Sequence, residues 1–190
     1  MAKRILLAGI LGGLALFVWG AISHTVLGLG EVGIQNLQKP VYEAMKASIS
    51  QPGFYLFPEM DKAGTIADEY KGGPVGILIY KPAGAGAPIT GQLINEAVLN
   101  IAQALIAAFL LSLVAGLVRY PQRVGFVFML GLLGAIGTNV EYWNWYGFPS
   151  SYTLAAITDD LIGFMIVGLI VAALVKPALG SMQVVTSKAA

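Results

Sequence analysis

Four stretches of the chain are apolar over the length that a membrane-crossing helix needs. A hydrocarbon core of roughly 30 Å takes about 20 helical residues at a rise of about 1.5 Å per residue. Stretches of this kind lie at Ile5–Leu27, Leu93–Val118, Val124–Val140 and Leu154–Val175. The pattern predicts an all-α membrane protein, built as a four-transmembrane-helix bundle.

The segments between these stretches differ in character. Residues 119–123 (Arg-Tyr-Pro-Gln-Arg) predict a tight basic hairpin, and residues 141–152 predict an aromatic turn around Pro149. Residues 28–92 carry charges and prolines of their own, so they predict an extramembrane region. The chain therefore divides into a first transmembrane helix at 1–27, a cap at 28–92, three further transmembrane helices at 93–175 and a tail at 176–190.

The cap has the pattern of a small α+β unit. Residues Pro40–Ser48 begin with proline and space their apolar side chains for a short amphipathic helix. Two β-type runs, Gly53–Phe57 and Val75–Tyr80, are each followed closely by a proline, and a polar, helical piece is expected between them at 63–70. Because such elements bury little apolar surface alone, we expect the cap to rest on the outer ends of the bundle.

Composition narrows the functional classes. The chain is 57% hydrophobic and 11% charged, whereas a soluble domain has about 25% charged residues. Its 11 basic residues against 10 acidic ones exclude the clustered basic excess of a nucleic-acid binder. Without cysteine, and with His24 as its single histidine, the chain offers too few ligands for the common zinc sites. We therefore do not expect an enzyme, and the sequence indicates no particular cofactor.

Basic residues predict the orientation of the chain in a bacterial inner, or plasma, membrane. Short loops rich in lysine and arginine stay in the cytoplasm. An even number of spans places the basic residues near the ends of the stretches on one face, namely Lys3, Arg4, Arg119, Arg123, Lys176 and Lys188. Both termini are thus expected in the cytoplasm. The first stretch loosely resembles a signal peptide. Its apolar run is longer than the roughly 7–15 residues of a usual signal-peptide core, so we expect an uncleaved anchor.

Two spans carry stripes that predict helix contacts. In the first, Gly9 and Gly13 form a GxxxG pair, and His24 lies on the same side nearer the outer end. In the second, polar residues recur at helical spacing, at Gln92, Glu96, Asn100 and Gln103. Because polar groups facing lipid are costly, this stripe is expected to line the bundle interior. Either interhelical hydrogen bonds or a water-filled cleft would explain it.

The ionisable residues of the spans all fall near the outer ends of their helices. Together with the amide of Asn100, these ionisable residues predict an outward-facing pocket, formed by His24, Glu96, Asn100, Glu141, Asp159 and Asp160. Asp159 and Asp160 lie about 100° apart around a helix, so only one is expected to point into the bundle, and we favour Asp160. Carboxylates this close need a cation, a shared proton or a basic residue of a partner. Alternatively, both aspartates occupy the first turn of a helix capped by Thr158.

The segment between the last two stretches is densely aromatic. Trp143, Trp145 and Tyr146 are predicted to form an aromatic mouth where an apolar ligand or a partner subunit would stack. An aromatic belt at the membrane surface explains the same residues without a ligand.

A resemblance supports the architecture. Trp19-Gly20 with Ser23-His24, Gly73-Pro74 before the run 76–82, and the aromatic run 142–149 resemble motifs of small uncharacterised bacterial four-span inner-membrane proteins with an extracytoplasmic loop after the first span. The resemblance covers most of the chain. It implies a bacterial inner membrane and no particular catalytic or binding residues.

Two functions remain after these exclusions. The first is a binding or accessory subunit that docks a partner through its outer face. The alternative is a small cation- or proton-linked transporter that uses the carboxylate pocket, although the inner halves of the spans are almost purely apolar. The expected partners are the lipid bilayer and a partner membrane subunit or a second copy of the chain, with no nucleic acid.

The orientation can be checked with single cysteines, because the chain has none of its own. Lys62→Cys in the cap is expected to react with an impermeant maleimide in intact cells, whereas Lys188→Cys in the tail is expected to stay protected. Labelling at position 188 with protection at position 62 would reverse the topology.

Overall fold

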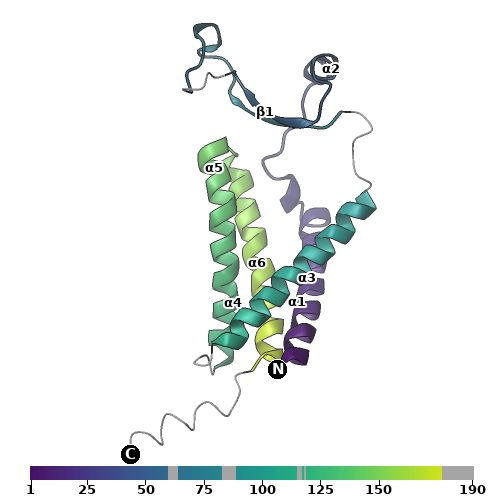
Figure 1. The fold of residues 1–190 in the computed structure, drawn as a ribbon, viewed down its shortest axis with the longest axis vertical. Helices are drawn as coiled ribbons and strands as arrows, with labels where there is room; N and C mark the ends of the chain where they lie inside the picture. The colour runs from purple at the N-terminus through teal and green to yellow at the C-terminus, as the bar shows by residue number, and fades with distance from the viewer. Residues whose placement is uncertain (60–63, 83–88, 115–116, 118, 177–190) are drawn as a thin grey trace, which may run out of the picture.

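The computed structural model describes residues 1–59, 64–82, 89–114, 117 and 119–176. Its long helices are α1 (Ala2–Thr25), α3 (Ile89–Leu113), α4 (Tyr120–Ala135) and α6 (Ser150–Leu174). Helix α4 continues through a π-helical turn, η3 (Ile136–Val140), into α5 (Glu141–Tyr146). These make four helices long and apolar enough to cross a membrane, and the predicted helical architecture is confirmed to that extent (Figure 1).

The cap consists of short elements. It contains α2 (Lys39–Ser48), β1 (Gly53–Phe57), β2 (Gly76–Tyr80) and two 3₁₀ turns, η1 (Leu29–Glu31) and η2 (Asp68–Tyr70). The strands pair antiparallel, from Gly53 opposite Tyr80 to Phe57 opposite Gly76. The predicted amphipathic helix and both strands are confirmed. The polar piece predicted at 63–70 is helical only over η2, and residue 63 lies outside the described part of the chain.

Both predicted turns between the later spans need correction. Residues 120–123 do not form a hairpin but begin α4, because Pro121 suits the first helical turn, where its missing N–H is not needed. The Gln122 side chain accepts a hydrogen bond from the Arg119 backbone N–H at 3.2 Å. The predicted aromatic turn is helical through Tyr146, and the chain turns at Gly147, whose φ of 69° favours glycine.

The long helices form two pairs. Helix α1 packs along α3, α4 packs along α6, and α1 and α6 join the pairs, whereas α3 barely contacts α4. We call the end of the bundle below the cap the cap side and the end that carries the N-terminus the tail side. Figure 1 shows α3 running obliquely, with its start far from α5 and its end near the start of α4. The helices of the bundle therefore converge on the tail side, and α3 and α5 lie apart on the cap side.

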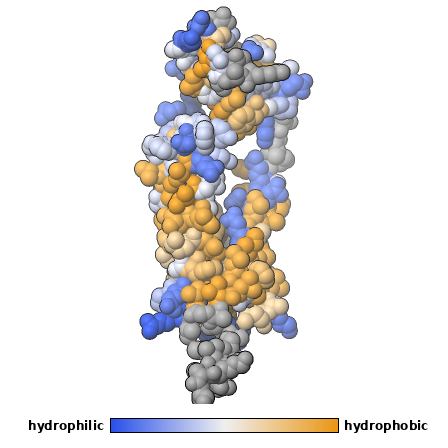
Figure 2. Space-filling model, turned by 60° about the vertical axis from the view of Figure 1, so that its left-hand side comes forward, coloured by the Kyte–Doolittle hydropathy of each residue, from blue (hydrophilic) through white to orange (hydrophobic). Residues whose placement is uncertain are grey.

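The core lies in the tail-side half and consists of small apolar residues. The buried cluster belongs to the first halves of α1 and α4 and the second halves of α3 and α6, and includes Ala8, Ala104, Ala107, Ala108, Val124, Val127, Val167, Val171 and Ala172. Figure 2 shows an apolar surface over the same half and hydrophilic residues nearer the cap. Small side chains let the helix axes approach closely, so contact in this half depends on van der Waals packing.

The predicted contact of the GxxxG pair is confirmed. A Cβ at Gly9 would collide with Leu105, and one at Gly13 would collide with the backbone of Ile101. Gly20, in the cap-side half of α1, has open space around its Cβ position. Glycine thus allows a close contact between α1 and α3 at Gly9 and Gly13, whereas Gly20 takes no part in it.

Two polar contacts fasten α4 to α6 at the tail side. Arg123 is buried and its Nε donates a hydrogen bond to the Ala172 carbonyl at 3.1 Å. The Tyr120 hydroxyl donates to the Leu169 carbonyl at 2.9 Å. These bonds use carbonyl lone pairs that the helix leaves free, so they join the helices without breaking α6.

Gly13→Leu is expected to destabilise the protein by about 1–3 kcal/mol, because the new side chain would push α1 away from Ile101. The measurement is a thermal or denaturant melt of the purified protein in mild detergent. Gly20→Leu is the matched control, since its site is open. Equal losses for the two variants would contradict a close α1–α3 contact at Gly13.

Candidate functional site: a polar cavity on the cap side

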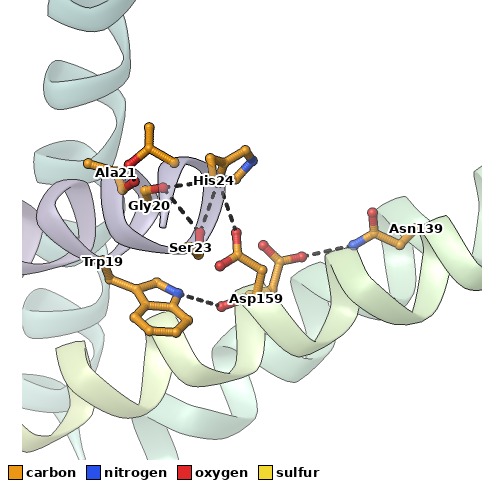
Figure 3. Close-up of polar contacts among 9 residues, drawn as sticks. Trp19, Gly20, Ala21, Ser23, His24, Asn139 and Asp159 are labelled. Atoms are coloured by element: carbon orange, nitrogen blue, oxygen red, sulfur yellow. Dashed lines mark hydrogen bonds and ion pairs between the residues drawn. The ribbon is translucent and has the colours of Figure 1, made fainter. Parts of the chain in front are cut away.

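A cavity of about 270 Å³ lies where the cap-side ends of α1, η3 and α6 meet beside η1. Its lining combines titratable, amide, aromatic and small residues: His24, Leu29, Gly30, Asn139, Tyr152, Ala155, Ala156, Asp159 and Asp160. Figure 3 shows the polar members coming from three different elements and pointing toward one another.

Asp159 faces α1. Its Oδ2 lies 3.9 Å from His24 Nδ1, a distance that makes an ion pair only when the imidazole is protonated. The indole Nε1 of Trp19 donates a hydrogen bond to the Asp159 backbone carbonyl at 3.1 Å and holds α1 against this turn of α6. The second carboxylate oxygen, Oδ1, is buried and has no hydrogen-bond partner within the described residues. A buried carboxylate oxygen without a donor is costly, so this group favours an added donor or cation.

His24 is held at the end of α1 by its own helix. Its Nδ1 lies 3.0 Å from the Gly20 carbonyl and 2.9 Å from the Ser23 hydroxyl. A Cβ at Gly30 would overlap the imidazole ring, so the 3₁₀ turn η1 packs closely over it. The side chain is nevertheless 58% exposed.

Asp160 faces the other neighbour of α6. Asn139 Nδ2 donates a hydrogen bond to Asp160 Oδ2 at 2.8 Å. The expectation that only one aspartate points inward is therefore wrong, because α6 lies between two helices and successive residues about 100° apart face one each. The capping alternative also fails, because α6 begins at Ser150 and the Thr158 hydroxyl donates to the Leu154 carbonyl.

Asn139 was missed by sequence reasoning because of the π-helical turn. At α-helical spacing Thr138 shares a side with Gly131, but Thr138 is exposed and Asn139 faces α6 instead. A π-helical turn closes on the fifth residue and displaces later positions relative to an α-helical projection. The Gly-Thr-Asn run inside η3 weakens the α-helix, which is the only signal the sequence offers.

The predicted convergence of all six residues does not occur. Glu96 and Asn100 lie on α3, which diverges from α6 on the cap side, and neither lines the cavity. Asn100 is buried beneath Gly13, whereas Glu96 is exposed. Glu141, in the first turn of α5, is exposed and outside the cavity as well. Within the described residues, no group of three or more His, Cys, Asp or Glu side chains is arranged to hold a metal ion.

The predicted aromatic mouth lies elsewhere. Trp145 and Tyr146 line a second recess of about 580 Å³, together with residues of β1 and β2, and Trp145 is 76% exposed. Trp143 donates from Nε1 to the Ser150 hydroxyl at 3.1 Å, which ties α5 to the start of α6. None of the three lines the polar cavity, because α5 carries them past its end toward the cap.

A chain of aromatic rings nevertheless connects the cap to the polar cavity. Phe54 of β1 meets Tyr146 edge to face at a centroid distance of 6.2 Å, and Tyr146 lies 5.6 Å from Tyr142. Tyr142 stacks on Phe148 at 5.4 Å, and Phe148 lies 5.4 Å from Tyr152, which lines the cavity. The cap therefore contacts the bundle through aromatic rings, at the α5 corner.

Comparisons with models of protein families, with curated proteins and with solved structures find no match to this chain. The assignment of a function therefore depends on the geometry of the site.

Removing the Asn139–Asp160 hydrogen bond is expected to lower the free energy of unfolding. In a double-mutant cycle of Asn139→Ala and Asp160→Ala, the coupling should be about 1 kcal/mol, the usual contribution of a hydrogen bond. The measurement is a denaturant melt in detergent. Thr138→Ala is the neighbouring control at an exposed position. A coupling near zero would mean that the two side chains do not interact in solution.

Proposed function

We propose that this protein is an accessory membrane subunit that docks a partner through its cap-side face, and that its polar cavity receives a cationic group of that partner. The observation that supports this function is the charge of the cavity. Two consecutive carboxylates, Asp159 and Asp160, line it, and none of its lining residues is a lysine or arginine. Only His24 among the lining residues can supply a positive charge.

The balance of charge favours a cation from outside. A protonated His24 would offset one carboxylate at most, and its 3.9 Å separation from Asp159 makes a weak pair. Asp160 has one neutral amide donor, and Asp159 Oδ1 has none within the described residues. A guanidinium or ammonium group would supply several donors and a full positive charge to these oxygens.

The cap-side location suits docking. The lining residue Tyr152 ends the aromatic chain that leads to β1, so a partner seated on the cavity would also meet the cap. Trp145 offers an exposed aromatic ring for the same partner. In this proposal the protein lies in a bacterial inner membrane with its cap outside, because Lys3 and Arg4 in the first turn of α1, and Lys176 just after α6, lie on the tail side.

A small cation- or proton-linked transporter is the second candidate, since the same cavity could take a free cation. Transport also needs a polar route to the other side. The tail-side halves of the helices bring together buried alanine and valine, and the buried Arg123 there is bonded to a backbone carbonyl. This packing favours binding at one face over passage through the bundle.

The test uses a photo-crosslinking amino acid in place of Ala156, which lines the cavity. In native membranes it should capture one partner, and mass spectrometry should place the crosslink within reach of a lysine or arginine of that partner. The double variant Asp159→Asn/Asp160→Asn keeps the shape of the cavity, removes its charge, and should abolish most of the crosslink. Glu141→Gln, an exposed carboxylate outside the cavity, is the control.

A charge exchange sharpens the result. Asp160→Lys should lose the partner, and replacing the partner's captured basic residue by aspartate should restore it. Loss of charge without loss of the crosslink would contradict the proposed docking. If the photo-crosslinking variant at Ala156 captures nothing, and the wild-type protein binds a small cation in calorimetry while the double variant does not, the result would favour the transporter.

A further inference from the structure

An exposed seam runs the whole length of α3. The spacing between its members alternates between three and four residues, like that between the contact positions of a two-stranded coiled coil. The members are Ile89, Gln92, Glu96, Leu99, Gln103, Ile106, Leu110 and Leu113. Leu110 is half-buried and every other member is exposed. The buried residues of α3, from Asn100 to Leu111, lie on a different side of the helix.

Exposure of this seam to lipid would be energetically unfavourable, because it contains polar side chains. Gln103 lies roughly 21 Å along the helix from Ile89 at about 1.5 Å per residue, near the middle of a helix long and apolar enough to cross a membrane. Its amide and the Glu96 carboxyl have no hydrogen-bond partner among the described residues. Intramembrane polar groups almost always face a helix or water, because hydrocarbon offers them no hydrogen bonds.

We propose that a second copy of this chain covers the seam, as a parallel and symmetric pair of α3 helices. Two copies inserted with the same topology bring α3 to α3 in parallel, and a twofold axis places each seam residue beside its own counterpart. A carboxamide both donates and accepts hydrogen bonds, so Gln92 and Gln103 each pair with themselves. The Glu96 carboxyls can share one proton in the same way.

The self-complementary chemistry distinguishes a second copy from another partner. Amide side chains within a coiled-coil seam fix register and favour association of identical helices. The surrounding seam residues are aliphatic and uncharged: Ile89, Leu99, Ile106, Leu110 and Leu113. The seam needs no basic residue from a partner, so this inference is independent of the proposed role of the carboxylate cavity on α6.

Disulfide crosslinking tests the geometry, because the chain has no cysteine of its own. Leu99→Cys and Ile106→Cys lie in the seam, and Val98→Cys and Phe109→Cys are equally exposed residues of α3 outside it. In full-length protein in bilayers, mild oxidation should yield dimers at the seam positions and little dimer at the other two. Equal crosslinking at all four positions, or none, would overturn the proposal.

Energy transfer between labelled copies in liposomes tests the amide contact. Gln103→Leu should weaken dimerisation roughly threefold to thirtyfold, as expected for the loss of an interhelical hydrogen bond in a membrane. Gln103→Asn should retain most of it, and Val98→Leu is the matched control. An unchanged dimer in Gln103→Leu would overturn the role of the seam. Capture of a different protein instead of a second copy by Leu99→Cys in native membranes would do the same.

Discussion

The close approach of α1 and α3 at Gly9 and Gly13 determines how the rest of the bundle is arranged. The absence of side chains there lets α1 contact the backbone of α3 in the tail-side half. A helix that crosses its neighbour obliquely at a close contact diverges from it beyond that contact. The cap-side half of α3 therefore leaves α4 and α5, and the polar residues of that half are not enclosed by a closed bundle.

Local features were predictable from sequence, whereas relative helix placement was not. Hydropathy and residue spacing depend on near neighbours, so they indicated the four long helices, the two cap strands and the Gly9–Gly13 contact. The predicted convergence of Glu96 and Asp160 did not occur, because it depends on the crossing angle between α3 and α6, which no residue pattern specifies. The sequence pattern did not indicate Asn139, because one π-helical turn changes which residue faces α6. It favoured Asp160 over Asp159, because the pattern does not show that α6 has neighbours on both sides.

The divergence of α3 separates two kinds of polar chemistry that the sequence alone had combined. Carboxylates and an imidazole gather at the junction of α1 and α6, where Trp19 and Asn139 fix the two aspartates against different helices. Amides and one carboxyl follow α3, on an exposed flank of the bundle. The first group lines a cavity and carries excess negative charge, while the second extends along one helix and contains a single carboxyl.

These differences require different occupants. A second copy could satisfy the α3 amides, but its own cavity carries the same excess of carboxylates over His24 and no lysine or arginine, so it is a poor source of a cation for Asp159 and Asp160. Conversely, a cationic partner at the cavity would leave Gln103 uncovered, since that residue lies on a helix that does not line the cavity. The two surfaces therefore do not compete. A symmetric pair joined through α3 would leave each cavity free to receive its own partner on the cap side.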